Sequence, residues 1–250
     1  RGYAHCGKPL AILGISGYIK GVGARCLHPF FVMKLLLAVQ SYTKANPIVA
    51  RHWPYYLNAG ADEIHGIGTT DGGCVWPEGV VSVEIGANRY ISGKHLPARL
   101  LDTIQYCLTT DASHFCIVEY DVLFFSKIPE WNGIAAHLAG FKLPNSQASF
   151  FIHNPWLIDR PTAETLLEVG RQLIAQEWPH GCVEGSPDCF LAWVCQEANV
   201  PVKFDLMKEF SRNSLDLAGS LEDARKSRLD GCDIIHGVKS QKELDYIMSA

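Results

Sequence analysis

The chain has 250 residues and a mass of 27.6 kDa, enough for one large α/β domain or two small ones. Its formal net charge is −4, with 19% charged and 48% hydrophobic residues, so it lacks the basic excess that nonspecific nucleic-acid binding requires. No apolar run approaches the ~18 residues of a membrane-spanning helix. The nearest run, residues 30–39, is short and contains Lys34. We therefore expect neither a nucleic-acid partner nor a membrane-spanning segment.

The nine cysteines are scattered through apolar segments without any C-x-x-C pair. Their odd number and distribution predict buried free thiols in a reducing compartment. The spacing of His180, Cys182, Cys189 and Cys195 matches no common zinc pattern. We expect a cytoplasmic location and leave peripheral association with a membrane open. The chain begins at Arg1 without a signal-peptide pattern, so a fragment or a processed product is expected.

The first third of the chain alternates between apolar runs of strand type and helix type. A helix that begins at Pro29 is predicted to bury Phe30, Met33 and Leu37. Pro54 weakens the second of the predicted strands. Strands are expected at residues 10–15, 48–57 and 63–67, and a helix at residues 29–43.

Residues 66–93 are rich in glycine and enclose one predicted strand, residues 80–85. Long loops of this kind are functional or disordered, and the sequence leaves both interpretations open. Residues 94–108 then predict a helix that buries Leu100 and Ile104.

The central feature is the apolar run at residues 115–125, FCIVEYDVLFF, which contains Glu119 and Asp121. Its composition predicts a strand buried on both faces. Residues i and i+2 of a strand point to one face, so the two acids can converge on one cation unless the strand has already ended. Paired carboxylates suit Mg²⁺ or Mn²⁺, whereas the simpler interpretation is two acids that serve turns or a buried basic side chain.

The second half continues the alternation. Strands or turns are expected at residues 134–141, 149–158, 202–206 and 232–235, and helices at residues 161–176, 189–198 and from Ser220 onward.

Two polar features in this half lie at the start of a predicted helix and after the last predicted strand. Ser186 is predicted to cap a helix with Pro187 in its first turn, which places Asp188 near the positive end of the helix dipole. His236 and Lys239 follow the last predicted strand, where they can supply a nitrogen ligand and a point charge for a phosphate. Plain capping and solvated charges are the simpler interpretations.

Alternating strands and helices over the whole chain predict a single α/β domain with a mostly parallel sheet covered by helices on both faces.

The order of the polar features resembles that of the GT-A fold glycosyltransferases, which use nucleotide sugars. In that superfamily a D-x-D motif at a strand end binds metal and sugar nucleotide, a later acidic motif addresses the acceptor, and a carboxyl-terminal His can complete the metal site. The resemblance spans about residues 10–239 in the order of elements, and only the combination of motifs is specific.

The resemblance implies a Rossmann-like GT-A domain with a nucleotide-binding half at about residues 10–128 and an acceptor-side half at about residues 129–240. It also assigns roles to individual residues. Asp121 and His236 match metal ligands for Mn²⁺ or Mg²⁺. Glu119 replaces the usual first Asp and would meet the ribose or sugar, or the metal through water. Lys239 is similar to a diphosphate-binding lysine, and Asp188 stands where the acceptor-side acid is expected. In an inverting reaction Asp188 would deprotonate the acceptor hydroxyl, whereas a retaining reaction would need no such base.

Further residues are expected near the nucleotide. The turn of Ser16, Gly17 and Tyr18 follows the first predicted strand, where ligands of open α/β sheets gather. Asp71 in the glycine-rich loop would flank the nucleotide, and Arg99 could reach a phosphate or remain a solvated charge near a helix start. The implied partners are a nucleoside-diphosphate sugar and a carbohydrate acceptor.

Two alternatives stay open. Residues 21–29 resemble the G-x-G-x-R-L-x-P loop of sugar-phosphate nucleotidyltransferases, although residues 16–20 intervene after the first strand and the double glycine is absent. A nucleotide- or carbohydrate-binding module without turnover would use its aromatic side chains to stack on sugar rings.

Overall fold

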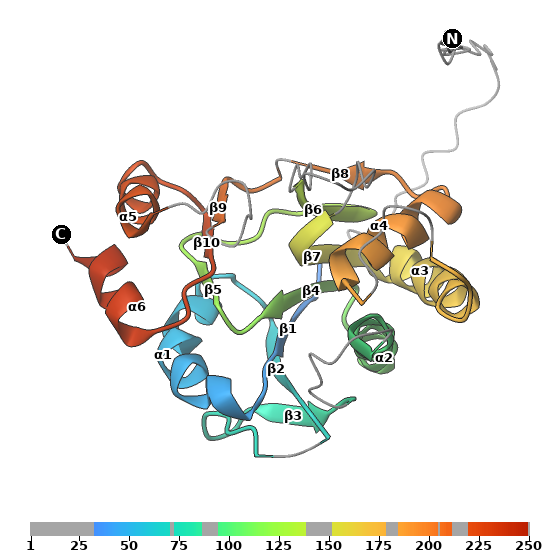
Figure 1. The fold of residues 1–250 in the computed structure, drawn as a ribbon, viewed down its shortest axis with the longest axis horizontal. Coiled ribbons are helices and arrows are strands. Elements are labelled where there is room, and N and C mark those ends of the chain that lie inside the picture. The colour runs from blue at the N-terminus through green and yellow to red at the C-terminus, as the bar shows by residue number, and fades with distance from the viewer. Residues whose placement is uncertain are drawn as a thin grey trace, which may run out of the picture. The chain divides into compact units, whose positions relative to one another are not determined.

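The computed structural model describes residues 33–70, 73–86, 95–138, 152–178, 185–204, 206–211 and 220–249. Figure 1 shows how their helices and strands alternate along the chain. The strands are β1 (Leu35–Gln40), β2 (Glu63–Gly68), β3 (Val81–Glu84), β4 (His114–Glu119), β5 (Val122–Phe124), β6 (Ile134–Leu138), β7 (Ile152–Asp159), β8 (Val202–Lys203), β9 (Glu209–Ser211) and β10 (Ile234–His236). The helices are the short 3-10 helix η1 (Thr43–Ala45), α1 (Asn46–Leu57), α2 (His95–Thr109), α3 (Arg160–Leu173), α4 (Pro187–Glu197), α5 (Leu221–Leu229) and α6 (Gln241–Met248).

A seven-stranded sheet with the order β3-β2-β1-β4-β7-β6-β8 forms the centre of this part of the chain. β3, β2, β1 and β4 are parallel, β7 runs antiparallel to both of its neighbours, and β8 is parallel to β6. The prediction of an α/β fold with a mostly parallel sheet is therefore confirmed.

The strand order reverses between β1 and β4. From β1 the chain moves outward to β2 and β3, and it then returns through α2 to pair β4 with the other side of β1. Because β1 and β4 are in register from Leu35 opposite His114 to Gln40 opposite Glu119, their carboxyl ends lie together. Open α/β sheets bind ligands outside the carboxyl ends of the strands at such a switch point.

Helices cover both faces of the sheet, as expected. α2, α3 and α4 pack on one face and α1 on the other (Figure 1). β1 supplies side chains to both cores, because Leu36 and Ala38 point towards α2 whereas Leu35, Leu37 and Val39 point towards α1.

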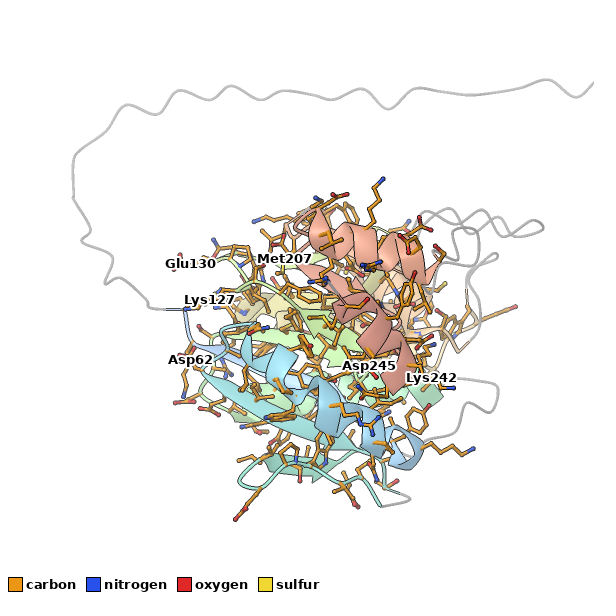
Figure 2. The ribbon with its side chains drawn as sticks, turned by 90° about the vertical axis from the view of Figure 1, so that its left-hand side faces the viewer. Asp62, Lys127, Glu130, Met207, Lys242 and Asp245 are labelled. Carbon is orange, nitrogen blue, oxygen red and sulfur yellow. The ribbon has the colours of Figure 1, made fainter. Side chains whose placement is uncertain are left out.

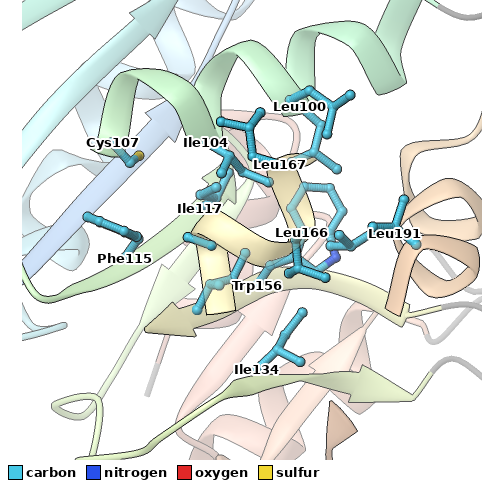
Figure 3. Close-up of a cluster of buried hydrophobic side chains, with 14 of the residues drawn as sticks. Leu100, Ile104, Cys107, Phe115, Ile117, Ile134, Trp156, Leu166, Leu167 and Leu191 are labelled. Carbon is cyan, nitrogen blue, oxygen red and sulfur yellow. The ribbon is translucent and has the colours of Figure 1, made fainter. Parts of the chain in front are cut away.

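The core under α2, α3 and α4 is the larger of the two, and Figure 3 shows its centre. Phe115 and Ile117 of β4 and Trp156 of β7 pack there against Leu166 of α3 and Leu191 of α4. Each such fully buried side chain stabilises the fold by about 1.5–3 kcal/mol relative to exposure. This packing holds β4 against β7 and so positions the carboxyl end of β4.

The central apolar run is broken into two strands. β4 ends at Glu119, and after Tyr120 and Asp121 the chain enters β5, which belongs to a separate sheet with the order β5-β10-β9. The prediction of one continuous strand at residues 115–125 is wrong, and Asp121 lies beyond the strand end. The apolar residues of β5 are explained by this second sheet, because Val122 and Phe124 point to the α1 core and Leu123 to the core of α5 and α6.

Two other predicted elements are wrong. The helix expected at residues 29–43 is replaced, in its described part, by β1. Every residue of Leu35–Val39 is buried. A strand that is apolar on both faces also has apolar residues at helical spacing, and this spacing led to the wrong prediction.

The strand expected at residues 48–57 is the helix α1. Its first turn contains a proline, and Pro54 lies within the helix. The buried residues Val49, His52 and Tyr56 follow helical spacing, which the prolines and the aromatic content obscured.

The elements η1, β9 and α6 were not predicted from the sequence. The other described helices and strands occur where the sequence predicts them, with shifts of a few residues at their ends. Ser186 and Ser220 cap α4 and α5 as expected, and the latter forms a capping box with Asp223. The described cysteines, at positions 74, 107, 116, 189, 195 and 232, are free, and all except Cys74 are buried.

Candidate functional site

Asp121 and His236 come together although 114 residues separate them in the chain. β10 pairs antiparallel with β5, which sets His236 opposite Val122, and the amides of Gly237 and Val238 each donate to the Asp121 carbonyl at 3.0 Å. The His236 Nε2 atom consequently lies 3.2 Å from Asp121 Oδ1, and both side chains are almost fully buried.

Glu119 completes what we call the acid–histidine cluster: Glu119, Asp121 and His236. One potential ligand atom from each residue lies within 4.8 Å of the others. Ligand atoms on one Mg²⁺ or Mn²⁺ ion at about 2.1 Å lie about 3 Å apart when adjacent and about 4.2 Å apart when opposite, so binding an ion would draw the three groups closer together. Two carboxylates and an imidazole are donors that suit Mn²⁺, and the residues therefore fit such an ion.

Two residues of α1 form hydrogen bonds to the turn that carries Asp121. The Tyr120 carbonyl accepts a hydrogen bond from the Tyr56 hydroxyl at 2.6 Å and another from His52 Nδ1 at 3.0 Å. Burial lowers the pKa of His52 to about 4, so its ring is neutral and carries its proton on Nδ1. Sequence reasoning missed both residues, because their roles depend on α1 being a helix.

His236 is enclosed by two further titratable residues that the sequence analysis also missed. The His153 ring from β7 stacks on it with centroids 4.3 Å apart, and Glu209 Oε1 from β9 lies 3.8 Å from its Nδ1 atom. Burial lowers the pKa of His236, although the Asp121 carboxylate acts in the opposite direction. A histidine within the apolar run at 152–158 is the one sequence signal for His153, and the charged stretch around Glu209 gives none.

Asp188 joins the same network through His153. The Ser186 hydroxyl accepts a hydrogen bond from the Cys189 amide, which fixes the start of α4 as predicted. Asp188 Oδ2 then lies 3.3 Å from His153 Nδ1. Burial favours a neutral His153, but the hydrogen bond and the charge of Asp188 outweigh it and raise the pKa of the ring to about 9. The His153 ring is therefore protonated at neutral pH.

The carboxyl groups of this region are crowded. Burial, followed by the charges of Asp121 and Asp188, raises the pKa of Glu119 to about 7. Burial raises the pKa of Glu209 to about 8. The site therefore gathers more acidic groups than it can hold in their charged form without further positive charge, which is the condition under which a cation is bound favourably.

Lys239 approaches the acid–histidine cluster from the solvent side. Its Nζ atom lies 3.7 Å from Asp121 Oδ2, and its side chain is 53% exposed. The Lys239 amide donates to Glu243 Oε2 at 2.6 Å, close to the start of α6. The sequence-predicted residues Glu119, Asp121, Asp188, His236 and Lys239 thus lie in one region.

A cleft opens at the switch point beside the acid–histidine cluster. Its walls come from the residues after β1, from the start of α2 and from the end of β4, and Glu119 is shared with the cluster. The rings of Tyr42 and Tyr120 meet edge to face at 5.2 Å within it. The cleft is lined by Gln40, Ser41, Tyr42, Leu96, Arg99, Leu100, Glu119, Tyr120 and Pro187.

Arg99 lies in the wall of this cleft, where its buried Nη2 atom donates to the main-chain carbonyls of Ser41 and Ile67 at 3.0 Å. It therefore ties the segment that follows β1 to the end of β2. Contact with a phosphate stays a prediction for this residue. The predicted nucleotide-flanking residues Ser16, Gly17, Tyr18 and Asp71 lie outside the described residues.

The chain matches no protein-family model, and no curated protein is significantly similar to it. None of the described helices is long and apolar enough to cross a membrane. The fold and the site define an α/β protein that gathers acidic and imidazole side chains at the carboxyl edge of its parallel strands.

Proposed function

We propose that this chain is a metal-dependent glycosyltransferase of GT-A type, which moves a sugar from a nucleoside-diphosphate sugar to a hydroxyl group of a carbohydrate acceptor. The observation that carries the proposal is the meeting of Glu119, Asp121 and His236 beside a cleft at the switch point of the sheet. The E-x-D and terminal His were assigned to one metal site by the resemblance, and their proximity supports that assignment.

The donor would lie along the edge formed by the ends of β1 and β4. Its nucleoside would occupy the cleft, where Tyr42 and Tyr120 offer aromatic surface, and its diphosphate would face Lys239. Asp121 and His236 would hold Mn²⁺ or Mg²⁺, with Glu119 on the ribose side or on the ion. When bound, a divalent cation offsets the negative charge that develops on a departing diphosphate.

Asp188 is the proposed base for an inverting transfer. It would accept the proton of the acceptor hydroxyl through a carboxylate oxygen, while His153 holds the other oxygen at 3.3 Å. The N-terminal position on α4 stabilises the charged carboxylate that this step requires. A retaining transfer would use Asp188 only to position substrate.

The first test is a thermal-shift titration with nucleoside diphosphates and nucleotide sugars, each with and without Mn²⁺. A ligand at one hundred times its dissociation constant stabilises the folded state by about 2.7 kcal/mol, which raises the melting temperature by roughly 5–11 °C for a chain of this size. We expect such a rise only when Mn²⁺ and the correct nucleotide are both present.

Asp121→Asn should abolish the Mn²⁺-dependent part of this shift, because it removes a charged ligand. The matched control is Asp245→Asn, whose side chain projects from the exposed side of α6 (Figure 2) and should leave the shift unchanged. An unchanged Mn²⁺ response in Asp121→Asn would sink the metal assignment.

Product analysis separates the competing functions. Hydrolysis or transfer of the sugar from a nucleotide sugar supports the glycosyltransferase, whereas pyrophosphate release from a nucleoside triphosphate and a sugar phosphate supports a nucleotidyltransferase. The loop on which that alternative depends, residues 21–29, lies outside the described residues. Binding of metal and nucleotide without turnover would identify a binding module.

A further inference from the structure

Lys239 contacts the one carboxylate that is common to the proposed metal and diphosphate sites. Its ammonium lies 3.7 Å from Asp121 Oδ2, while His236 Nε2 lies 3.2 Å from Asp121 Oδ1. Asp121 is 1% exposed and the Lys239 side chain is 53% exposed. The ammonium of an exposed lysine side chain therefore lies next to a buried carboxylate.

The main chain around Lys239 is anchored, but its side chain has room to reorient. The Gly237 and Val238 amides donate to the Asp121 carbonyl, and the Lys239 amide donates to Glu243. The lysine side chain is a compact point charge on a flexible four-carbon stem. The ammonium can consequently exchange one anionic partner for another within its reach while the backbone stays in place.

A divalent cation and the Lys239 ammonium would compete for Asp121. Both are attracted to the same carboxylate, and they repel each other over the few ångströms that separate the acid–histidine cluster from Nζ. A diphosphate group placed against both cations removes this repulsion, because it gives the ammonium a new partner and adds negative charge next to the ion.

We propose that Lys239 couples the two ligands of this site: it weakens the binding of a divalent cation alone and strengthens its binding together with a diphosphate. The inference rests on the proposed function. By linkage, the factor by which the diphosphate tightens the cation equals the factor by which the cation tightens the diphosphate. The site would thus take up its cation together with the donor rather than ahead of it.

The test is a titration with Mn²⁺ followed by electron paramagnetic resonance, alone and with uridine diphosphate or guanosine diphosphate. Lys239→Met should bind Mn²⁺ alone about 3- to 10-fold more tightly than the wild type, because the competing charge is gone. The tightening of Mn²⁺ by the nucleoside diphosphate should fall by about tenfold in the same variant. These opposite changes distinguish the coupling from a general loss of structure.

Lys242→Met is the matched control, since it removes the same charge from an exposed position on α6 (Figure 2). It should change neither affinity by more than about twofold, which is the size expected from screened surface charges. Lys239→Arg keeps the charge and should retain the coupling.

Two results would overturn the inference. One is a Lys239→Met variant that binds Mn²⁺ alone no more tightly than Lys242→Met does. The other is a nucleoside diphosphate effect on Mn²⁺ affinity that is the same in Lys239→Met and in the wild type. Failure of the proposed function is a different observation, namely a wild-type protein that binds neither Mn²⁺ nor any nucleoside diphosphate tested.

Discussion

The imidazole of His236 has an acid near each of its ring nitrogens. Asp121 lies 3.2 Å from Nε2 and Glu209 lies 3.8 Å from Nδ1. A histidine that binds a metal through one nitrogen usually donates from the other to a carboxylate, a carbonyl or water, which fixes the tautomer and raises the basicity of the ligand. Glu209 is placed to take that part, after a movement of less than about 1 Å towards the ring.

Replacing Glu209 with Leu should therefore weaken Mn²⁺ binding by about 10- to 100-fold. Glu209→Gln keeps an acceptor oxygen and should lose less. The affinities can be measured by calorimetric titration, with circular dichroism to check folding. Glu197→Leu changes an exposed acid on α4 and serves as the control. A folded Glu209→Leu protein with wild-type Mn²⁺ affinity would show that this acid does not position His236.

At the level of elements, α1 supports the metal site without contributing a ligand. Tyr56 and His52 both donate to the carbonyl of Tyr120, and the next residue is Asp121. The buried Tyr56 ring also packs in the core between α1 and the sheet. Helix α1 and the turn at Tyr120 are therefore expected to move as one body.

Tyr56→Phe removes one of these donors and keeps the ring. We expect a loss of about 0.5–1.5 kcal/mol in the free energy of unfolding, measured with urea, together with a several-fold loss of Mn²⁺ affinity. Tyr55→Phe is the matched control, because Tyr55 lies on the same helix and packs against Phe125. Equal Mn²⁺ affinity in the two variants would confine Tyr56 to a role in stability.

Several elements could be predicted because their signals are local. The caps at Ser186 and Ser220 mark the starts of α4 and α5, and the apolar run before Glu119 marks β4. β1 and α1 were predicted wrongly because burial on both faces removes periodicity, and because the prolines of α1 lie in a helix that tertiary packing stabilises.

The candidate site was predictable only in part for a related reason. Glu119 and His236 end strands and Asp121 follows one closely, and the carboxyl ends of neighbouring strands meet at the edge of a sheet. His153, Glu209, His52 and Tyr56 join them through pairings and packing that depend on the complete fold, and none of these four residues has a motif of its own.

For the whole molecule, the raised pKa values near the site predict how stability changes with pH. Glu209 has a folded-state pKa of about 8, above its value in an unfolded chain, so the folded form binds the extra proton between about pH 4.5 and 8. The stabilising contribution of this proton is complete below the unfolded pKa and is lost as the pH rises through 8. His153, with a pKa of about 9, loses its contribution between about pH 6.5 and 9.

In the presence of a chelator, the free energy of unfolding should therefore fall from pH 6 to pH 9, by about 3 kcal/mol from Glu209 alone. Urea denaturation at the two pH values measures the change. Glu209→Gln cannot lose this proton and should show a smaller fall. A stability that rises over this interval, or an identical fall in Glu209→Gln, would contradict the prediction.

The residues of the proposed site come from two different sheets. Glu119 ends a strand of the large sheet, whereas His236 and Lys239 belong to a segment whose buried side chains pack mainly with α5, α6 and β5. Sequence changes in this terminal segment can alter the nitrogen ligand and the phosphate-facing charge while the main framework keeps its interior intact. Natural or engineered substitutions in this segment can therefore change the ion preference and the donor affinity while the core of the large sheet stays the same.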